Sequence, residues 1–335
     1  MIEWVSMFTK DFDYKLPEDL IANAPVSPRD ASRLMVLDRD SKEIKHHNFF
    51  DLSEFLRSDD VLVFNESKVI PARILFEKNE ILLLRDLGSN VWEAMVRPGR
   101  VFKEGSSLDI KPGLSVFVQE VNEDGTRILK FEGDLNLEEV GVAPFPPYIK
   151  DSPAKLEDYQ TIYAKTKGSV AAPTAGLHFT DNVFEKLDEK GVQTEFLTLH
   201  VGMGTFQPVK ADNIKDHKMH SEWFSLNKEV TSRLNLAKEK GGRIFAVGTT
   251  SVRVLESCTE NGRLVPQSGD TDIFIYPGYE FKFVDGMVTN FHLPKSTLMM
   301  LVSAFADKDF IFGAYEEAVK EKYRFYSFGD SMLIL

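Results

Sequence analysis

The chain is predicted to be an α/β protein, with a main domain in which a mixed sheet packs with helices and an inserted all-β, barrel-like domain. Two observations predict this. Short β-rich runs broken by turn residues fill roughly residues 70–148, with no helix-length pattern among them. Outside that stretch, apolar strand-like runs occur on both sides and alternate with helical patterns on the C-terminal side. We therefore expect an α/β domain from residues 1–69 plus 149–335, and an insertion at residues 70–148.

The elements before residue 149 are all expected to be strands. Leu34–Asp38 and Val61–Asn65 are apolar runs of strand length. Runs in the insertion are separated by turn signals such as Pro98-Gly99 and Pro112-Gly113, which is typical of a small barrel or sandwich. The expected strands there are Arg73–Glu77, Glu80–Leu87, Val91–Val96, Ser107–Ile110, Ser115–Val121 and Arg127–Phe131.

Helices and strands alternate in the remainder of the chain. Thr180–Lys190 shows the signals most clearly, because a hydroxyl N-cap opens it and Gly191 follows it. The other expected helices are Pro153–Lys165, Asn227–Lys240, Thr250–Thr259, Ser296–Ala306 and Asp309–Tyr323. The expected strands are Thr194–Val201, Arg243–Val247, Thr271–Ile275 and Met332–Leu335.

Composition restricts the class of protein. The 335 residues contain one cysteine, Cys258, so neither an internal disulfide nor a cysteine-rich zinc site is possible, and we expect this thiol to be buried on a helix. No apolar run approaches the roughly 20 residues of a membrane span. We expect a soluble, cytoplasmic monomer without a metal or prosthetic group.

The net charge of −12 opposes nucleic-acid binding, which depends on cations that neutralise phosphates. An acidic protein can still carry one basic face, and a cluster surrounds the Pro98-Gly99 turn. The alternative is that these are ordinary solvated charges. The candidate nucleic-acid residues are Arg97, Arg100 and Lys103 near this turn, together with Lys68 and Arg73.

Three segments join a strand-like run to small residues, hydroxyls and a His or Arg: Val170–Thr180, Leu197–Val209 and Ala246–Ser257. Glycines allow a ligand to approach the backbone, and loops at strand ends are where binding residues concentrate. In the third segment, N–H groups at a helix N-terminus would receive a carboxylate near Arg253. N-capping by Thr249 or Thr250 is the simpler alternative, which leaves Arg253 unexplained.

Two glycine- or lysine-containing motifs do not fit common nucleotide sites. Gly202-Met203-Gly204 lacks the third glycine of a dinucleotide or methyltransferase turn, because Gln207 occupies that position. Lys295-Ser296-Thr297 lacks the glycines of a phosphate-binding loop, which disfavours an NTPase. Ser296 is instead expected to cap a helix whose N-terminus, with Lys295, binds an anionic group.

Most histidines fall in the C-terminal half. His217, His220 and Glu222 have spacing that a metal could use, but without a further matched ligand the signal is weak and a surface helix start explains it equally well. His178 and His200 lie in two of the three segments close to Gly and Thr, His292 is close to Asn290, and His220 lies in Met219–Glu222. A single such histidine is usually a core residue, but four together favour a site.

The segments Val170–Thr180, Leu197–Val209 and Ala246–Ser257 resemble the S-adenosylmethionine:tRNA ribosyltransferase-isomerase family of queuosine biosynthesis. The resemblance runs in order from about residue 11 and includes the opening motif Phe12–Pro17 with Pro28–Leu34, then Val63–Asn65 with Val69–Arg73. Met219–Glu222, Thr289–Leu298 and Tyr323–Asp330 complete it. The sequence departs from the usual pattern at Glu66-Ser67-Lys68, where Lys68 retains the charge of an expected arginine but not its planar fork.

The resemblance implies an enzyme that transfers the ribosyl part of S-adenosylmethionine to 7-aminomethyl-7-deazaguanine at the wobble position of tRNA and isomerises it. The product is epoxyqueuosine in tRNA, with adenine and methionine released. The sulfonium of S-adenosylmethionine makes the neighbouring C5′ protons acidic. A base of near-neutral pKa is therefore sufficient to remove one of them and start the reaction. The alternatives are an S-adenosylmethionine-dependent RNA methyltransferase and a non-catalytic RNA-binding protein.

Site residues follow from the same resemblance. The acid–base candidates are His178, His200, His220 and His292, with Glu222 orienting His220 and Asn290 fixing the tautomer of His292. The residues expected to hold S-adenosylmethionine, which is a co-substrate, are Thr174, Gly176, Gly202, Gly204, Thr205, Thr249, Thr250, Arg253, Lys295 and Ser296.

Overall fold

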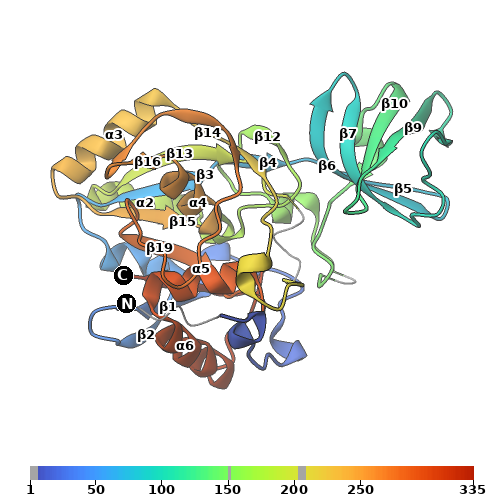
Figure 1. The fold of residues 1–335 in the computed structure, drawn as a ribbon. Helices are drawn as coiled ribbons and strands as arrows, with labels where there is room; N and C mark the ends of the chain where they lie inside the picture. Colours follow the sequence, from blue (N-terminus) through green and yellow to red (C-terminus); the bar gives the residue numbers. More distant parts are fainter. Residues whose placement is uncertain (1–6, 150–151, 203–208) are drawn as a thin grey trace.

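The computed structural model describes residues 7–149, 152–202 and 209–335, and contains two large sheets (Figure 1). The first has nine strands in the order β18-β14-β13-β3-β15-β19-β20-β1-β2. Its strands are β1 (Arg33–Leu37), β2 (Ile44–Asn48), β3 (Val61–Asn65), β13 (Gln193–Leu199), β14 (Glu222–Leu226), β15 (Ile244–Val247), β18 (Gln267–Thr271), β19 (Gly286–Asn290) and β20 (Ser331–Ile334).

The centre of this sheet is parallel and buried on both faces. β13, β3, β15 and β19 run parallel, whereas β14 and β20 are antiparallel to their neighbours β13 and β19. All five residues of β3 are buried, because Val61 and Val63 face one core while Leu62 and Phe64 face the other. Such continuous apolar strands are expected where helices cover both faces of a sheet.

Five helices of the described chain accompany this sheet: α2 (Asp181–Lys190), α3 (Lys228–Glu239), α4 (Thr249–Ser257), α5 (Thr297–Ala306) and α6 (Lys308–Lys320). α2 packs into the core that contains Leu62, and the other four pack into the core that contains Val63. The predicted caps are present: Thr180 accepts from the Val183 N–H, and Ser296 accepts from the Met299 N–H.

The second sheet has seven antiparallel strands in the order β11-β5-β6-β7-β10-β9-β8 and lies at one end of the molecule (Figure 1). Register shifts in three of its strand pairs curl it, so it is a half-barrel. Its strands are β5 (Arg73–Phe76), β6 (Asn79–Gly88), β7 (Val91–Arg97), β8 (Ser107–Lys111), β9 (Leu114–Val121), β10 (Arg127–Gly133) and β11 (Gly141–Val142). The short helix α1 (Leu137–Val140) precedes β11.

The mixed α/β architecture is confirmed, and so are the six strands expected between residues 73 and 131. The expected helix at Pro153–Lys165 is wrong: only Leu156–Tyr159 forms a short 3₁₀-helix. Tertiary contacts prevail there, because the Gln160 side chain exchanges two hydrogen bonds with the backbone of Val69. The expected strand Thr271–Ile275 is also wrong, since pairing with β14 stops at Thr271.

Several strands were not predicted. β2 carries the polar sequence Ile-Lys-His-His-Asn at the sheet edge, where only one neighbour is needed. β14 begins at Glu222, where a surface helix start was considered. The two-stranded pairs β4 (Ser67–Val69) with β12 (Thr166–Ser169) and β16 (Thr259–Glu260) with β17 (Arg263–Leu264) are short.

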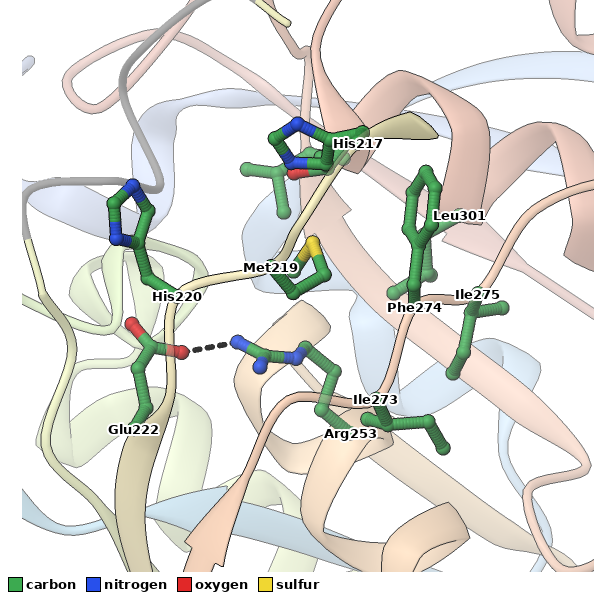
Figure 2. A pocket seen from close by; sticks show the side chains of 11 residues that line it. His217, Met219, His220, Glu222, Arg253, Ile273, Phe274, Ile275 and Leu301 are labelled. Atoms are coloured by element: carbon green, nitrogen blue, oxygen red, sulfur yellow. Dashed lines mark hydrogen bonds and ion pairs between the residues drawn. The ribbon is translucent and has the colours of Figure 1, made fainter. Parts of the chain in front are cut away.

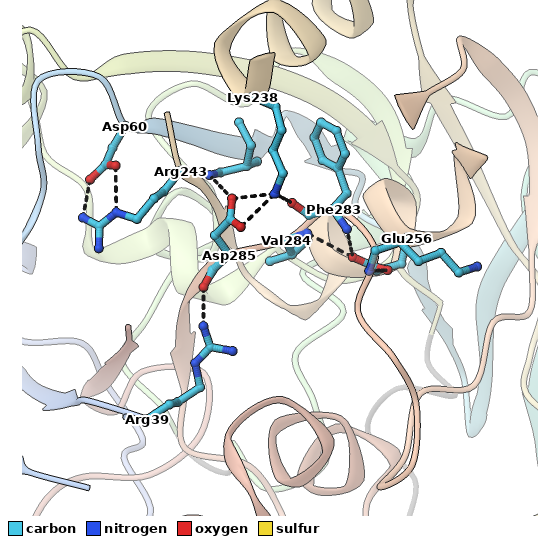
Figure 3. Close-up of polar contacts among 10 residues, drawn as sticks. Arg39, Asp60, Lys238, Arg243, Glu256, Phe283, Val284 and Asp285 are labelled. Carbon is cyan, nitrogen blue, oxygen red and sulfur yellow. Dashed lines mark hydrogen bonds and ion pairs between the residues drawn. The ribbon is translucent and has the colours of Figure 1, made fainter. Parts of the chain in front are cut away.

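Two carboxylates, the buried Glu256 and the half-buried Asp285, fix the helices around the sheet (Figure 3). Glu256 of α4, which is 1% exposed, accepts hydrogen bonds from the backbone N–H groups of residues 282–284 and from the Tyr279 hydroxyl. Asp285 accepts from Lys238 of α3 and from the Ile244 N–H. The position of α4 is therefore set by charge-assisted hydrogen bonds as well as by apolar packing. Cys258, which follows α4, is buried as expected.

Candidate functional site

The N-terminus of α4 opens into a small pocket of about 50 Å³. Strand β15 ends at Val247, and Gly248 turns the chain into the helix with φ +83°, a conformation that favours glycine. The helix thus starts at Thr249, and neither Thr249 nor Thr250 is the N-cap. The pocket is lined by Tyr148, Ala172, Pro173, Thr174, Ala175, Val201, Gly248, Thr249, Thr250, Thr289, Asn290, Phe291, His292, Leu293, Leu298, Tyr326 and Ser327.

Among the described residues, the hydroxyl of Thr250 has no hydrogen-bond partner, although the residue is only 8% exposed and lines this pocket. A buried polar group without a partner costs free energy unless something else satisfies it. The first N–H groups of a helix also lack intrahelical acceptors. The pocket therefore offers hydrogen-bonding groups to a polar or anionic ligand.

His292 borders the same pocket but is 7% exposed. Its Nε2 lies 3.0 Å from the Thr289 hydroxyl, so Thr289, and not Asn290 as expected, contacts this ring. Burial lowers the pKa of His292 to about 3. The imidazole is consequently neutral near pH 7 and contributes hydrogen bonding, not positive charge.

His178 is enclosed in protein. Its Nδ1 lies 2.7 Å from the Ser32 hydroxyl and its Nε2 lies 3.0 Å from the Asn290 amide nitrogen, while the ring stacks on Phe49. Burial, and then the charges of Arg29 and Arg324, lower its pKa to about 3. With both ring nitrogens bonded inside the protein, His178 holds Asn290, which lines the pocket, in position.

A second pocket, of about 30 Å³, is lined by Arg253 of α4 (Figure 2). His220 and Glu222 lie on one side of it, opposite the apolar side chains of Phe274, Ile275 and Leu301. Leu298 lines both pockets, so they adjoin. The complete lining is His217, Met219, His220, Glu222, Arg253, Ile273, Phe274, Ile275, Thr297, Leu298 and Leu301.

Glu222 and Arg253 form an ion pair in this pocket, and both are 5% exposed. Glu222 also accepts from the Gly202 N–H at 2.7 Å, and Arg253 donates to the Thr271 carbonyl at 3.2 Å. Arg253 therefore binds a carboxylate of the protein itself, and Nε of its guanidinium has no hydrogen-bond partner in the described part of the chain.

A much larger cavity of about 1190 Å³ separates the half-barrel from the edge of the nine-stranded sheet. His217, His220 and Glu222 line both this cavity and the second pocket. His200 also lines it, stacked on Trp223 with ring centroids 5.0 Å apart. Gly168 lies beside this ring with φ +137°, which favours glycine, and a Cβ there would lie 2.7 Å from Nε2 of His200, so the ring would have to shift. Burial lowers the pKa of His200, and no described residue forms a hydrogen bond with its Nδ1.

Three expected ligand-binding residues have contacts within the protein. Lys295 lies 2.7 Å from Asp13 in a half-exposed ion pair. Ser296 caps α5 and donates to the Leu293 carbonyl. Gly176 is tightly packed, since a Cβ there would collide with the Tyr163 hydroxyl at 1.8 Å. Gly202 lines the large cavity. Gly204 and Thr205 lie outside the described residues.

The expected nucleic-acid residues divide into two groups. Arg97, Arg100 and Lys103 are exposed at the end of β7 and in the turn that follows. Arg73, by contrast, lies 3.1 Å from Glu80 and donates to the Phe145 carbonyl, and Lys68 is half-buried on β4. Only the first group presents free cationic surface.

Some pocket residues were not singled out from the sequence. Thr289 lies within the segment Thr289–Leu298, and its hydroxyl next to a histidine was a usable signal. Trp223 follows Glu222 directly, but nothing in the sequence shows that its ring stacks on His200. Within residues 7–149, 152–202 and 209–335, no group of three or more His, Cys, Asp or Glu side chains is arranged to hold a metal. Over the same ranges, no helix has the length and apolarity needed to span a membrane.

Comparisons with known proteins identify the family of this chain. Residues 9–334 match the family model described as queuosine biosynthesis protein. S-adenosylmethionine:tRNA ribosyltransferase-isomerase of Thermotoga maritima is 54% identical over 336 residues, covering 98% of this chain and 100% of the relative. The enzyme of the same name from Halothermothrix orenii is 53% identical over 344 residues, with the same coverages.

A solved structure is similar as well. The crystal structure of S-adenosylmethionine tRNA ribosyltransferase from Thermotoga maritima is 44% identical, with a TM-score of 0.57, and the match covers 97% of this chain and 100% of that one. A family match over nearly the whole chain and relatives of this identity lead to one conclusion: the chain belongs to the queuosine biosynthesis protein family.

Proposed function

We propose that this protein is an S-adenosylmethionine:tRNA ribosyltransferase-isomerase. It transfers the ribosyl moiety of S-adenosylmethionine to 7-aminomethyl-7-deazaguanine in tRNA and isomerises it, which gives epoxyqueuosine and releases adenine and methionine. The observation that carries the proposal is the full-length identity of 53–54% to enzymes of that name. The grouping of predicted residues around α4 supports it.

S-adenosylmethionine binds, in this proposal, across the two adjoining pockets. Thr174, Thr249 and Thr250 line one of them, and the hydroxyl of Thr250 is available to the ligand. Glu222 and Arg253 line the other, beside an apolar wall. Hydroxyls and helix N–H groups suit polar parts of the co-substrate, while apolar side chains suit its adenine.

Among the four candidate histidines, His220 best fits the acid–base role. It is exposed, it lines the second pocket, and it faces the large cavity as well. His178 and His292 have pKa values of about 3 because they are buried, far from the near-neutral value that proton transfer at pH 7 favours. We assign them positioning roles. His200 is placed in the large cavity, where its stacked ring contacts a substrate.

Residues 70–148 act, in the same proposal, as an inserted domain that contacts the tRNA. Arg97, Arg100 and Lys103 supply its cations, since they are exposed and, among the described residues, form no ion pair. Charged residues of this kind give nucleic-acid affinity even in a protein whose net charge is −12.

The decisive experiment is product analysis after incubation with S-adenosylmethionine and tRNA. We expect equal amounts of adenine and methionine, and only when the tRNA carries the aminomethyl base. Formation of S-adenosylhomocysteine would identify a methyltransferase instead. Binding of the tRNA without consumption of S-adenosylmethionine would identify an RNA-binding protein.

A further inference from the structure

The large cavity between the two sheets is lined by charged side chains from both sides. On the wall formed by the half-barrel, Glu93 of β7 and Asp124 of the β9–β10 turn are present. The opposite wall, from the main body of the chain, carries the exposed cations Lys210 and Lys218. At about 1190 Å³ the space is within reach of a nucleotide-sized ligand, for which binding pockets are typically a few hundred to a thousand Å³.

The two carboxylates converge on one hydroxyl. The Thr126 Oγ1 lies 3.2 Å from Glu93 Oε1 and 2.8 Å from Asp124 Oδ1, and it accepts from the Asn122 amide at 2.8 Å. A single hydroxyl has one proton to donate, so at least one of the two carboxylates keeps acceptor capacity toward the cavity. Among the described residues, neither Glu93 nor Asp124 forms an ion pair with a lysine or arginine.

Three other charged residues of the cavity are paired within the protein, whereas Asp86, Asp216, Lys210 and Lys218 also line it and form no ion pair among the described residues. Glu222 is paired with Arg253, Arg85 lies 3.2 Å from Asp270, and Lys167 lies 3.3 Å from Glu138. Glu93 and Asp124 differ from the unpaired Asp86 and Asp216 in that both contact one hydroxyl, that of Thr126. Two neighbouring anions without a cation repel each other, and a bound cation relieves that repulsion.

Asp124 also lies close to the acid–base candidate. Desolvation raises the pKa of its carboxyl, but hydrogen bonds from Thr126 and the charge of His220 lower it further than desolvation raises it. His220 lines the second pocket, the proposed co-substrate site, as well as the large cavity. A group held at Asp124 is consequently near the place where the two spaces meet.

We propose that Glu93 and Asp124 are the specificity determinants for the tRNA base, and that they hold its charged aminomethyl group in the cavity. This inference rests on the proposed function. A primary alkylamine, like the lysine side chain, is protonated near neutral pH, and two carboxylates distinguish it from a base that lacks the amine. The exposed edge of Trp223 and the ring of His200 offer a surface on which a base stacks.

The test compares two tRNAs that differ only in the amine: one with the free aminomethyl base and one in which that amine is acetylated and so uncharged. Affinity is measured for the wild type, for Glu93→Gln, for Asp124→Asn and for the double variant. Glu123→Gln is the matched control, because Glu123 is an exposed carboxylate beside Asp124 that does not line the cavity.

We expect the wild type and Glu123→Gln to bind the free amine roughly ten- to a hundredfold more tightly than the acetylated one, as loss of a hydrogen bond to a charged group predicts. The double variant should lose this preference, and in turnover its KM for tRNA should rise while its KM for S-adenosylmethionine is unchanged. A wild type that binds both tRNAs equally overturns the inference without requiring any variant to fold. So does a folded double variant that keeps the preference.

The two proposals fail in different ways. If the wild type releases no adenine with the aminomethyl tRNA, the proposed function is wrong. If it releases adenine and both single variants keep the wild-type KM for tRNA, the function stands and the role of Glu93 and Asp124 is wrong.

Discussion

Asn290 joins His178 to the pocket at the N-terminus of α4. Its amide nitrogen lies 3.0 Å from Nε2 of His178, and its amide oxygen accepts from the Thr174 hydroxyl at 3.0 Å. Because this amide donates to Nε2, the proton of the neutral ring is on Nδ1 and is donated to Ser32. The histidine motif and the pocket threonine are thus parts of one hydrogen-bonded chain, which holds Thr174 in place.

The buried His178 predicts a dependence of stability on pH. Its pKa is about 3 in the folded protein and about 6.5 when unfolded. Between these values the unfolded chain binds more protons, so the free energy of unfolding falls as the pH falls below about 6.5, by up to about 1.4 kcal/mol per pH unit for this group. His178→Gln, which cannot be protonated, should be less stable than wild type at pH 7.5 but lose less stability on acidification.

The measurement is urea unfolding from pH 7.5 to 4.5. His47→Gln is the control, because His47 is a partly exposed residue of the edge strand β2. Parallel pH profiles for wild type and His178→Gln would show that His178 does not titrate in this way.

The Glu222–Arg253 pair predicts strong coupling between two positions. Removal of one partner leaves a buried charge unpaired, which typically costs about 3–5 kcal/mol. Glu222→Gln and Arg253→Met should each destabilise the protein, and the double variant should be less destabilised than the sum. A double-mutant cycle in urea measures the coupling, and strictly additive effects would contradict a direct ion pair.

Much of the fold could be predicted from local patterns, but the partners of the site residues could not. Thr180 and Ser296 cap helix N-termini with their side chains, and Gly191 ends a helix in the left-handed conformation. All three helix ends lie where they were expected. Pro153–Lys165 failed because Gln160 bonds to Val69, 91 residues away in sequence. Local helix propensity cannot predict a contact between residues so far apart in sequence.

The site shows the same limit. The sequence placed Arg253 one turn into a helix, and it is there, but its guanidinium faces Glu222 across 31 residues of chain. Asn290 was expected to form a hydrogen bond with His292. In the structure Asn290 contacts His178, and Thr289 contacts His292 instead. The loops that form the site and the types of residue in them could be predicted from the sequence. The pairs of side chains that contact each other could not, because those pairs depend on the order of the strands in the sheet.

His220 is the residue whose loss should affect turnover most specifically. It is exposed and lines the second pocket and the large cavity, so His220→Ala removes no core packing. We expect turnover to fall by roughly 10²–10⁴-fold, the usual contribution of a general acid or base, with an unchanged melting temperature. His292→Ala should instead lower the melting temperature, because that side chain is buried and bonded to Thr289.

Single-turnover release of adenine and thermal unfolding, measured on both variants, check this pair of expectations. If the activity of His220→Ala stays within about threefold of wild type, the loss is well below that expected for removal of a general acid or base, and His220 is not a catalytic residue. His292 takes its place if His292→Ala loses turnover while its melting temperature is unchanged.

The exposed arginines at the end of β7 predict how tRNA binding depends on salt. Each phosphate contact contributes roughly 0.7–0.9 to the slope of log affinity against log salt concentration. Arg97→Ala with Arg100→Ala should therefore weaken tRNA binding and reduce that slope by up to about 1.4–1.8, with little effect on S-adenosylmethionine. The control is Arg57→Ala with Arg263→Ala, which removes two exposed arginines from the main body. It changes the net charge equally, so an effect of charge alone would appear in both double variants. If the β7 variant binds tRNA as tightly as wild type at every salt concentration, or the control weakens it as much, the half-barrel does not carry the tRNA surface.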